Sequence, residues 1–572
     1  MAQPYILISP VGAWAAESWI RIGVRDQSDK RWQEAERSYR LALSLEPGHA
    51  AATNNLAVLY AQSGHLNVGL VTIERASLLK PTPVQVLINW SLMCIEAYRM
   101  EEALLHAEEA HKLEPCQETS QLLHIAYSTS GRQGESLPYL LDVVRRMPKH
   151  TEAMANVCFA QTLSDCSLDE MLVQRMRFRT EHGYNGVRQP HTNQLGLIER
   201  KLRVGYVGGD FKTHSAASIF KGVILDHGEG FEPYIYSTLL TKPELDPRTR
   251  EFKDKIPWRD IEKLDDEAAD ALIRKDGIDI LVDLAGHTAG GRIPLFSRKP
   301  APVQITAWGF AVGTGCPEID YFFADAVTVP EEESPYYLES IVHLPCIITF
   351  NPPVANLSTS SPLPFFENES ITFGFFARYE KMSDLCLLAI QEILLNTPGS
   401  CLLCKDGHFD RPEVIRRVRG MMHKIDPSRL LFLGGTTHED HMQSMQRCDM
   451  MLDPFPHSGG VGSLEQLYMG VPVVTLCGKT PAGRLTSSVL TQIKRTEWIA
   501  KDVSAYIDIA SALAINTSTL RDARKTLSKE LMESPVVKGY TKAVEDVYRE
   551  VWSYHVKQEA KAKAEQALCS VS

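Results

Sequence analysis

Small and apolar residues recur with a fixed period in the first 165 residues. Prolines at 47, 81, 115 and 148 lie 34, 34 and 33 residues apart, each after an apolar or charged helical pattern such as "SLEP" or "KLEP". Other positions keep the same phase: Ala35, Gly69, Ala103 and Ser136; Tyr39, Ile73, Ala107 and Leu140; Ala42, Ala76, Ala110 and Val143. Small residues allow two antiparallel helices to approach closely, and proline ends the second helix. We therefore predict an α-helical repeat solenoid over residues 15–165 and a helical linker over 166–200.

The spacing A-x3-[aromatic or apolar]-x2-A with a closing proline resembles the tetratricopeptide repeat. One helix pair cannot bury its own apolar face, so such repeats stack into a solenoid. Solenoids of this kind usually present a concave surface to a peptide or a partner protein. A dimer surface and a simple spacer are the alternative uses of this region.

After residue 200, apolar runs of strand type alternate with helical patterns. The first half contains strand-like runs at 202–211, 232–238, 279–283 and 301–310, with helical patterns at 214–227 and 266–276. The second half repeats the alternation from residue 370, with a first strand that ends at residues 377–381 and further strands at 400–406, 429–435, 449–455 and 471–476. Such alternation predicts parallel sheets with right-handed crossovers.

The predicted fold class is thus a helical solenoid followed by two α/β, Rossmann-like domains and a C-terminal helix. The N-terminal lobe covers 201–347 and the C-terminal lobe covers 371–535. A segment rich in Pro, Ser and Asn at 348–370 links them, and a helix with a Lys/Glu tail occupies 536–572. We expect ligands in the cleft where the strands of the two lobes end.

Composition narrows the class of protein. The chain has 572 residues and a net charge of −11, so it offers no broad basic face to nucleic acid or anionic lipid. No apolar run approaches the ~18 residues that a membrane span needs. The N-terminus lacks a positive segment and carries Pro4 and Pro10, which argues against a signal peptide. The twelve cysteines are scattered, and Cys401 and Cys404 have no second pair, which favours reduced thiols and a cytoplasmic protein.

A glycine-rich turn lies before the last predicted strand, in "DPFPHSGGVGSLEQLYMGVPVVTL" over residues 453–476. The spacing of Leu464, Leu467 and Tyr468 predicts a helix that begins near Gly462 or Ser463. The first N–H groups of that helix and its dipole favour an anion, and glycines let the anion come close. The turn lacks the residues of a Walker A loop and of a G-x-G-x-x-G fingerprint. A diphosphate site and a tight helix–strand packing turn are the two interpretations.

These residues resemble a known family. The donor-loop stretch with "TPAGRLTSSVL", together with "RVGYVGGDFKTHSAASIF", "DILVDLAGHTAGGRIPLFSRKPAPVQITAWGF" and "FARYEKM", is similar to the nucleocytoplasmic O-GlcNAc transferase/SPINDLY glycosyltransferases. A tetratricopeptide array before two Rossmann-like lobes, called the GT-B fold, is the architecture of that family. The resemblance covers most of residues 15 to 555. It implies transfer of a sugar from a nucleotide diphosphate to a Ser or Thr hydroxyl, with inversion.

The resemblance also implies roles for individual residues. His214 and Lys381 are implied as catalytic residues, His214 as the candidate base and Lys381 on the donor phosphates, although a donor phosphate is an alternative base. The implied donor-binding residues are Arg378, Thr436, His438, His441, Gly459, Gly460, Val461, Gly462 and Glu465, with Thr437 in the same base-reading loop. The implied acceptor and sugar pocket comprises Asp210, His287, Arg292, Trp308 and Gly309. Each has a structural alternative, such as a helix-capping carboxylate for Glu465 or a surface ion pair for Arg378.

The chain departs from the family pattern at two loops. In the family that the chain resembles, the donor loop usually carries paired threonines or a His-Thr-Thr where Gly460, Val461 and Gly462 stand here, so hydroxyl donors to the phosphates are lost. The loop after "AWGF" reads "AVGTG" instead of Pro-Gly-Thr. Both changes bear on the donor sugar and on activity.

The expected function is an inverting glycosyltransferase that moves GlcNAc from UDP-GlcNAc to Ser/Thr of proteins. No D-x-D motif stands at a strand end, so we expect neither metal nor cofactor, with cations and helix dipoles in their place. The expected partners are a nucleotide sugar and a protein or peptide acceptor, docked on the solenoid or not, with a homodimer as a further option. The alternatives are a GDP-fucose or UDP-glucose transferase and a degenerate nucleotide-sugar sensor.

Overall fold

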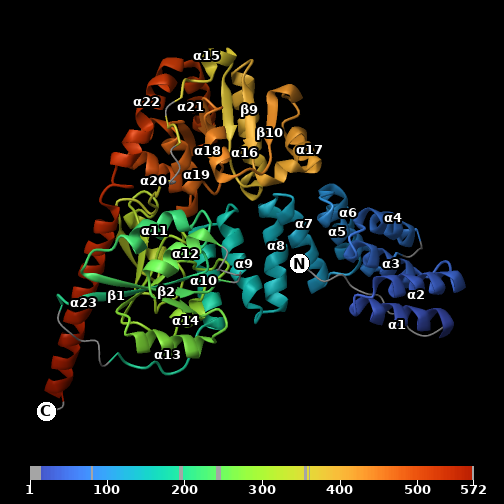
Figure 1. Cartoon of the computed structure of the whole chain (residues 1–572), viewed down its shortest axis with the longest axis horizontal. Helices are drawn as coiled ribbons and strands as arrows, with labels where there is room; N and C mark the ends of the chain where they lie inside the picture. Colours follow the sequence, from blue (N-terminus) through green and yellow to red (C-terminus); the bar gives the residue numbers. More distant parts are fainter. Residues whose placement is uncertain are drawn as a thin grey trace. The chain divides into compact units, whose positions relative to one another are not determined.

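The protein forms two compact units. The computed structural model describes residues 14–78, 82–191, 198–239, 246–352, 357–359 and 361–569. The first unit comprises residues 1–147 with 411–417, and the second comprises 148–410 with 418–572. Figure 1 shows that helices build the first unit, whereas strands and helices alternate in the second.

Antiparallel helix pairs make up the first unit. Its helices are α1 (Trp14–Ser28), α2 (Trp32–Leu45), α3 (Ala50–Gln62), α4 (Leu66–Ser77), α5 (Val84–Glu96), α6 (Met100–Leu113), α7 (Gln117–Thr129) and α8 (Gln133–Arg146). Within each pair, α1 packs on α2, α3 on α4, α5 on α6 and α7 on α8. Prolines 47, 115 and 148 follow the ends of α2, α6 and α8, as the 34-residue period predicts. Pro81 lies outside the described residues.

The phased small residues are the contact points of these pairs. Ala35, Ala103 and Ser136 are all completely buried. At Gly69, a β-carbon would lie 2.8 Å from the carbonyl oxygen of Ala57 in the facing helix. The backbones of α3 and α4 therefore approach too closely for any larger residue. The predicted helical solenoid is confirmed.

The second unit begins with two helices, α9 (Thr151–Thr162) and α10 (Leu168–His182), which pack against each other. Sequence analysis assigned α9 to the end of the solenoid. In the structure its contacts place it with the second unit. Cys158 of α9 and Met171 of α10 share a buried cluster with Phe310, Val312 and Ala482 of the α/β lobes.

A seven-stranded parallel sheet forms the N-terminal lobe, in the order β3-β2-β1-β4-β5-β6-β7. The strands are β1 (Leu202–Gly208), β2 (Phe231–Ser237), β3 (Trp258–Asp260), β4 (Ile280–Asp283), β5 (Val303–Thr306), β6 (Tyr321–Ala324) and β7 (Ser340–His343). The helices are α11 (Ala217–Leu225), α12 (Pro247–Lys255), α13 (Asp266–Asp276) and α14 (Ile293–Phe296). The central strands β4 and β5 are buried at every position, as expected for a parallel sheet covered on both faces.

A six-stranded parallel sheet forms the C-terminal lobe, in the order β10-β9-β8-β11-β12-β13. Its strands are β8 (Thr372–Phe375), β9 (Cys401–Lys405), β10 (Leu430–Leu433), β11 (Met450–Leu452), β12 (Val473–Leu476) and β13 (Ile499–Ala500). The helices are α15 (Phe365–Asn368), α16 (Asp384–Asn396), α17 (Pro412–Met421), α18 (His438–Met445), α19 (Val461–Tyr468), α20 (Leu485–Gln492), α21 (Val503–Ile515) and α22 (Thr517–Glu533). The predicted fold class, a solenoid followed by two Rossmann-like domains, is confirmed.

Each sheet has one point at which the strand order reverses. In the N-terminal lobe it lies between β1 and β4, and in the C-terminal lobe between β8 and β11. Loops leaving the carboxyl ends of two such strands run in opposite directions and leave a crevice. The segments after β8 and β11 contain the FARYEK and DPFPHSGG sequences, so the fold places both at one crevice.

The last helix, α23 (Tyr540–Cys569), returns to the N-terminal lobe and packs against α11 and β5 (Figure 1). The Tyr548 hydroxyl lies 3.2 Å from that of Tyr206 in β1, and the Trp308 indole donates to the Tyr540 hydroxyl at 3.0 Å. Cys346 accepts from Tyr540 through its backbone carbonyl at 2.9 Å. Helix α23 therefore stabilises the N-terminal lobe through the hydroxyl groups of Tyr540 and Tyr548.

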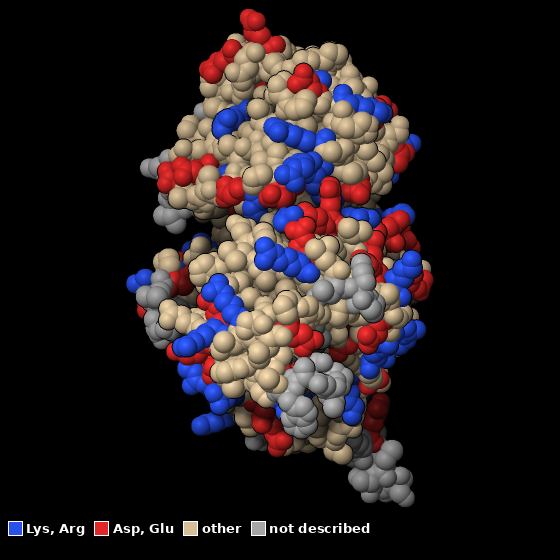
Figure 2. Space-filling view, turned by 90° about the vertical axis from the view of Figure 1, so that its right-hand side faces the viewer, with Lys and Arg blue, Asp and Glu red and all other residues tan. Residues whose placement is uncertain are grey.

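The lobes are also joined by α20. Both terminal nitrogens of Arg484 contact Glu333, each at 2.7 Å, and Ser488 donates to Asp325 at 2.6 Å. On the face shown in Figure 2, acidic and basic side chains are intermixed over the surface. Among the described helices, none has the length and apolar character needed to cross a membrane.

Candidate functional site

Lys381 lies at the strand-order reversal of the C-terminal lobe. It ends a short 3-10 helix, η3 (Tyr379–Lys381), directly after β8. Its ammonium group donates to the backbone carbonyl of Ser458 at 2.7 Å, within the glycine loop that follows β11. Burial lowers the pKa of Lys381, and the neighbouring charge of Arg378 lowers it further. The carboxylates of Asp453 and Glu380 oppose this shift, and the partly buried ammonium group is suited to an anionic ligand.

The buried carboxylate of Asp453 holds the glycine loop in place through hydrogen bonds. Its carboxylate accepts from the Gly459 N–H at 2.9 Å, from Ser463 at 3.2 Å and from Thr475 at 2.7 Å. Burial raises the pKa of this carboxyl, and the hydroxyl and N–H donors partly offset that effect. The loop's shape is thus fixed by one carboxylate and its three donors. The sequence stretch contained Asp453, but sequence analysis gave it no role.

The three glycines of this loop serve different purposes. A β-carbon on Gly459 would lie 2.0 Å from the Ser463 hydroxyl and 2.5 Å from the Asp453 carboxylate, so packing requires this glycine. Gly460 is the N-cap of α19, which begins at Val461, one residue earlier than predicted. At Gly462 a β-carbon would meet nothing within 4 Å. The first turn of α19 therefore has open space beside it, and its leading N–H groups have no partner within the helix.

The base and ribose side of the predicted donor site lies around α18. Thr437 caps this helix, and Lys405 at the end of β9 donates to the Thr436 hydroxyl at 2.9 Å and to the Gly434 carbonyl at 3.0 Å. Glu465 on α19 contacts His438 at 2.7 Å. This hydrogen bond raises the pKa of His438. The structure thus brings the base-reading loop and the predicted ribose carboxylate together.

His441 and Arg378 complete the predicted donor set. The His441 ring packs near Phe376 at the end of β8, and burial lowers its pKa. The Arg378 side chain is exposed and makes no hydrogen bond or ion pair with any residue in the part of the chain that the structure describes. Its charge nevertheless acts on the Lys381 ammonium group. Arg378 therefore lies near Lys381, whereas His441 lies near Phe376 and Glu465.

A cavity of about 100 Å³ lies beside this loop and is lined by both lobes. Its lining comprises Phe159, Thr162, Ile219, Trp308, Gly309, Phe310, Ala311, Ile347, Ile348, His457, Gly460, Ala482 and Leu485. The predicted pocket residues Trp308 and Gly309 are among them. Trp308 holds a left-handed backbone conformation with φ of 58°, which is strained for a bulky residue. A β-carbon on Gly309 would lie 1.7 Å from the carbonyl oxygen of Leu284, so only glycine fits there.

Asp210 and His214 follow β1, at the strand-order reversal of the N-terminal lobe. The His214 Nδ1 accepts from the Ala216 N–H at 3.2 Å and lies 3.6 Å from the Asp210 carboxylate. The His214 side chain is 46% exposed, so a macromolecular acceptor can reach it. Neither residue lines the cavity.

Two other predicted pocket residues occupy structural positions in this conformation. The His287 Nε2 lies 2.7 Å from the Thr314 carbonyl, and its ring packs edge-on against Phe178 and Phe310. Burial lowers the pKa of His287 to about 4. Arg292 pairs with Asp266 at 2.5 Å and donates to two backbone carbonyls. His287 thus lies behind the cavity wall at Phe310, and Arg292 lies away from it.

Several residues of the site carried no sequence signal. Phe159 and Thr162 come from α9, far from either lobe in the sequence, and Lys405 ends a strand without any motif. His457 lies inside the quoted glycine-loop stretch, and its residue type was the one available signal.

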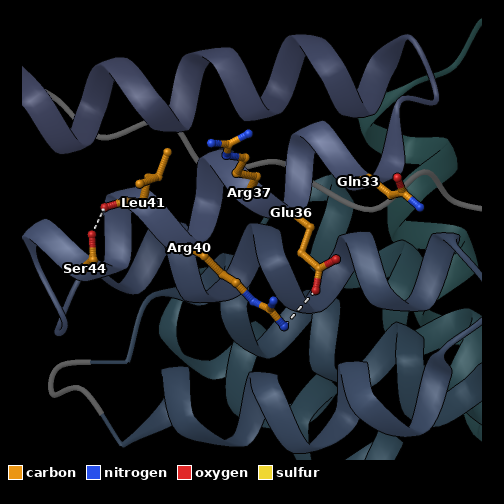
Figure 3. A pocket seen from close by; sticks show the side chains of 6 residues that line it. All are labelled: Gln33, Glu36, Arg37, Arg40, Leu41 and Ser44. Carbon is orange, nitrogen blue, oxygen red and sulfur yellow. Dashed lines mark hydrogen bonds and ion pairs between the residues drawn. The ribbon is translucent and has the colours of Figure 1, made fainter.

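A larger hollow, of about 290 Å³, lies on α2 of the first unit (Figure 3). Its lining comprises Gln33, Glu36, Arg37, Arg40, Leu41 and Ser44. Glu36 and Arg40 form an ion pair across it at 2.8 Å. None of the predicted donor residues lines this hollow, and its charged residues Glu36 and Arg40 pair with each other. The larger volume therefore does not identify the candidate site.

Comparison with known proteins places this geometry in context. The sequence model described as Glycosyl transferase family 41 matches residues 184–350 and 356–544. The probable UDP-N-acetylglucosamine–peptide N-acetylglucosaminyltransferase SPINDLY of Oryza sativa subsp. japonica is 32% identical over 378 residues, which are 64% of this chain and 40% of that protein. The protein of the same description from Arabidopsis thaliana is 31% identical over 377 residues, 63% of this chain and 40% of its own. The chain thus spans about two fifths of the length of these relatives.

A solved structure covers more of the chain. A mutant of the Thermobaculum terrenum O-GlcNAc transferase superposes with a TM-score of 0.70 over 96% of this chain and 99% of its own, at 24% identity. At that identity the likeness concerns the fold. It extends over the helical repeats and both parallel sheets.

Proposed function

The chain belongs to glycosyl transferase family 41, and from that premise we propose that it transfers GlcNAc from UDP-GlcNAc to Ser or Thr hydroxyls of proteins, with inversion. Two SPINDLY relatives carry the description of a UDP-N-acetylglucosamine–peptide transferase. The observation that carries the proposal is the position of Lys381. Its ammonium group supports the backbone of a loop whose glycines leave the first turn of α19 open.

The proposed reaction needs charge stabilisation on the leaving diphosphate. When the bond from the sugar's anomeric carbon to the phosphate oxygen breaks, negative charge grows on that oxygen. Lys381 and the N–H groups at the start of α19 are fixed before the reaction, so they need no reorganisation. A diphosphate would add negative charge beside Lys381, whose pKa burial and Arg378 lower despite the carboxylates of Asp453 and Glu380. The donor loop has lost the family's threonines, and these groups take over their task.

The acceptor hydroxyl must lose its proton as it attacks the anomeric carbon. His214 is the proposed base, through Nε2. In the structure Nδ1 accepts the Ala216 N–H, and a small rotation toward Asp210, 3.6 Å away, would instead hold an Nδ1–H. That tautomer leaves Nε2 with a free electron pair for the hydroxyl. Asp210 is thus a positioning residue for His214.

The donor is tested by a thermal-shift panel with UDP, UDP-GlcNAc, UDP-glucose, GDP and GDP-fucose, followed by transfer of labelled sugar to protein acceptors. We expect stabilisation by the uridine compounds and transfer from UDP-GlcNAc. Lys381→Ala should abolish transfer, whereas Lys494→Ala, on an exposed turn, should not. Stronger binding of GDP-fucose and transfer from it would show that GDP-fucose is the donor. Binding of a nucleotide sugar without any transfer or hydrolysis would indicate a nucleotide-sugar sensor.

Three further parts of the proposal concern partners, metal and location. We propose that the solenoid docks the protein acceptor, that a divalent metal is not required, and that the protein works in the cytoplasm. If the solenoid docks the acceptor, substitutions along it should reduce transfer to proteins but not to short peptides. If no divalent metal is required, transfer should be undiminished in EDTA. Fractionation of cells tests the cytoplasmic location.

A further inference from the structure

A lysine without a carboxylate partner lies beside the loop that follows β10. Lys405 ends β9 and pairs in register with Leu433, the last residue of β10 (Figure 1). The residue is 3% exposed and forms no ion pair with a described residue. Its ammonium group donates to the Gly434 carbonyl at 3.0 Å and to the Thr436 hydroxyl at 2.9 Å. Burying a charge costs free energy, so this lysine needs a role that an apolar side chain could not fill.

Lys405 and Asp410 hold the two sides of one peptide group. The oxygen of the peptide between Gly434 and Gly435 accepts from Lys405, and the N–H of the same peptide donates to the Asp410 carboxylate at 3.1 Å. Asp410 ends η4 (Gly407–Asp410), the short 3-10 helix that follows β9. A β-carbon on Gly434 would lie 1.6 Å from that carboxylate, so the contact requires glycine. A cation on one side and an anion on the other thus fix the direction of this peptide.

This peptide needs to be held because glycine stands on both sides of it. Residues without a β-carbon have the widest choice of φ and ψ, so a peptide between two glycines can turn over at little steric cost. Such a turn would change the direction in which the chain continues into Thr436. The two charged side chains therefore select one path for the loop among several.

Thr436 is where this loop has backbone groups to offer. Its hydroxyl accepts from Lys405 and donates to the Thr437 carbonyl at 3.2 Å, and the Thr437 hydroxyl is used in capping α18. Among the described residues, neither the N–H nor the carbonyl of Thr436 has a hydrogen-bond partner. The threonine side chains are thus used within the loop, and the Thr436 backbone is left for a ligand.

A donor next to an acceptor on one backbone residue distinguishes between bases. Uracil presents a carbonyl oxygen beside a ring N–H, which match the N–H and the carbonyl of Thr436. Cytosine presents an amino group beside a bare ring nitrogen, so that donor would meet donor and acceptor would meet acceptor. Guanine is like uracil in this respect, and adenine is like cytosine. The match lasts only while the Thr436 backbone keeps one direction.

We propose that Lys405 and Asp410 are positioning residues that lock the Gly434–Gly435 peptide and thereby give the donor site its preference for uracil over cytosine. This inference rests on the proposed function, because it assumes a nucleoside diphosphate beside Lys381. It goes further in assigning base selectivity to two side chains that act through the loop backbone and not on the base itself.

The experiment measures dissociation constants of UDP, CDP and inorganic pyrophosphate for the full chain by calorimetry. Lys405→Met keeps the length of the side chain and removes the ammonium group. We expect it to bind UDP about tenfold more weakly and pyrophosphate like the wild type, so that the preference for UDP over CDP falls by about the same factor. Lys405→Arg keeps hydrogen-bond donors and should recover part of the preference.

The second clamp residue gives an independent measurement. Asp410→Ala should lower the preference for UDP over CDP in the same direction as Lys405→Met. Because both side chains hold one peptide, the double variant should lose little more preference than either single variant. Loss of stability alone would weaken the binding of all three ligands and leave the ratio of UDP to CDP unchanged.

Lys299→Met is the matched control, because Lys299 in the N-terminal lobe also donates to a backbone carbonyl, that of Glu318 at 2.9 Å. It should leave the ratio unchanged. A ratio that is also unchanged in Lys405→Met, or a wild type that binds UDP and CDP equally, would overturn the inference and leave the proposed function intact.

Two outcomes bear on the proposed function separately. A wild type that prefers GDP to UDP would replace the proposed donor, and the ratio of GDP to ADP would then carry the same test, because guanine has the carbonyl and N–H that adenine lacks. A wild type that binds none of these diphosphates would overturn both the proposed function and the inference.

Discussion

At the scale of single residues, the site depends on one partly buried lysine whose charge is costly in the free protein. Burial and Arg378 lower the pKa of Lys381 below its ordinary 10.5. The charged form binds a diphosphate, so nucleotide binding is full below the lowered pKa and is lost as pH rises through it. We expect the affinity for UDP to fall as pH rises above about 7, the lowered pKa of Lys381, towards about pH 9.5, a range in which an ordinary lysine stays mostly protonated.

The control for that titration is Lys381→Arg. A guanidinium keeps its charge throughout this range, so UDP affinity in the variant should be lower but independent of pH. Calorimetric dissociation constants at several pH values measure both slopes. A wild-type affinity that stays constant up to about pH 9.5 would show that the lysine remains charged without ligand.

Two glycines in the same loop give a second prediction at this scale. Gly459→Ala should destabilise the fold, because its β-carbon would collide with Ser463 and Asp453. Gly462→Ala meets nothing and lies inside a helix, so it should raise stability by about 0.5–1 kcal/mol. Yet its β-carbon occupies the proposed approach of the phosphates, so UDP should bind more weakly. Thermal unfolding and UDP titration of both variants measure these opposite effects; unchanged UDP binding in Gly462→Ala would remove the phosphates from this turn.

At the scale of elements, α23 is predicted to stabilise the N-terminal lobe through one hydroxyl. Tyr540 accepts from the Trp308 indole and donates to the Cys346 carbonyl, and all three groups are buried. Tyr540→Phe leaves the indole N–H unsatisfied and should cost about 1–3 kcal/mol. Because Trp308 lines the cavity, binding of UDP-GlcNAc should weaken more than binding of UDP. Denaturant unfolding with the two titrations separates the effects, and equal weakening would argue that α23 acts on stability alone.

At the scale of the second unit, the ion pair of Arg484 and Glu333 is predicted to hold the two lobes together. Their side chains are only 10% and 17% exposed, so removing one partner leaves a buried charge and should cost about 3–5 kcal/mol. The double variant Arg484→Ala/Glu333→Ala should be less destabilised than the sum of the two single ones. The pair Arg495–Glu530, whose side chains are more exposed at 23% and 30%, lies within the C-terminal lobe and is the control. Weakened UDP binding should follow only from the first pair, since Arg484 also binds the Gly478 carbonyl beside the donor loop.

The same scales separate what the sequence predicts from what it does not. The repeat period located Ala35, Gly69 and Ala103 at helix contacts, because close packing of two helices demands small residues at fixed intervals. Periodicity and glycines likewise located the parallel strands and the donor loop. The sequence did not indicate that Phe159 and Thr162 line the cavity, because their position depends on how a helix packs against loops some 150 and 300 residues away. His287 and Arg292 showed the converse: each lies in a glycine loop but bonds to other parts of the fold, His287 through Nε2 to the Thr314 carbonyl and Arg292 to Asp266.

The packing of α9 has a practical consequence for anyone shortening this protein. The family match begins at residue 184, which suggests a convenient place to cut. Cutting there would discard α9 and α10 and bring Phe310, Val312 and Ala482 into contact with water. A fragment that starts near residue 148 retains these helices and should remain soluble and bind sugar nucleotides. The smallest stable fragment is therefore expected to be longer than the region that the family match covers, because it needs α9 and α10, which no motif marks.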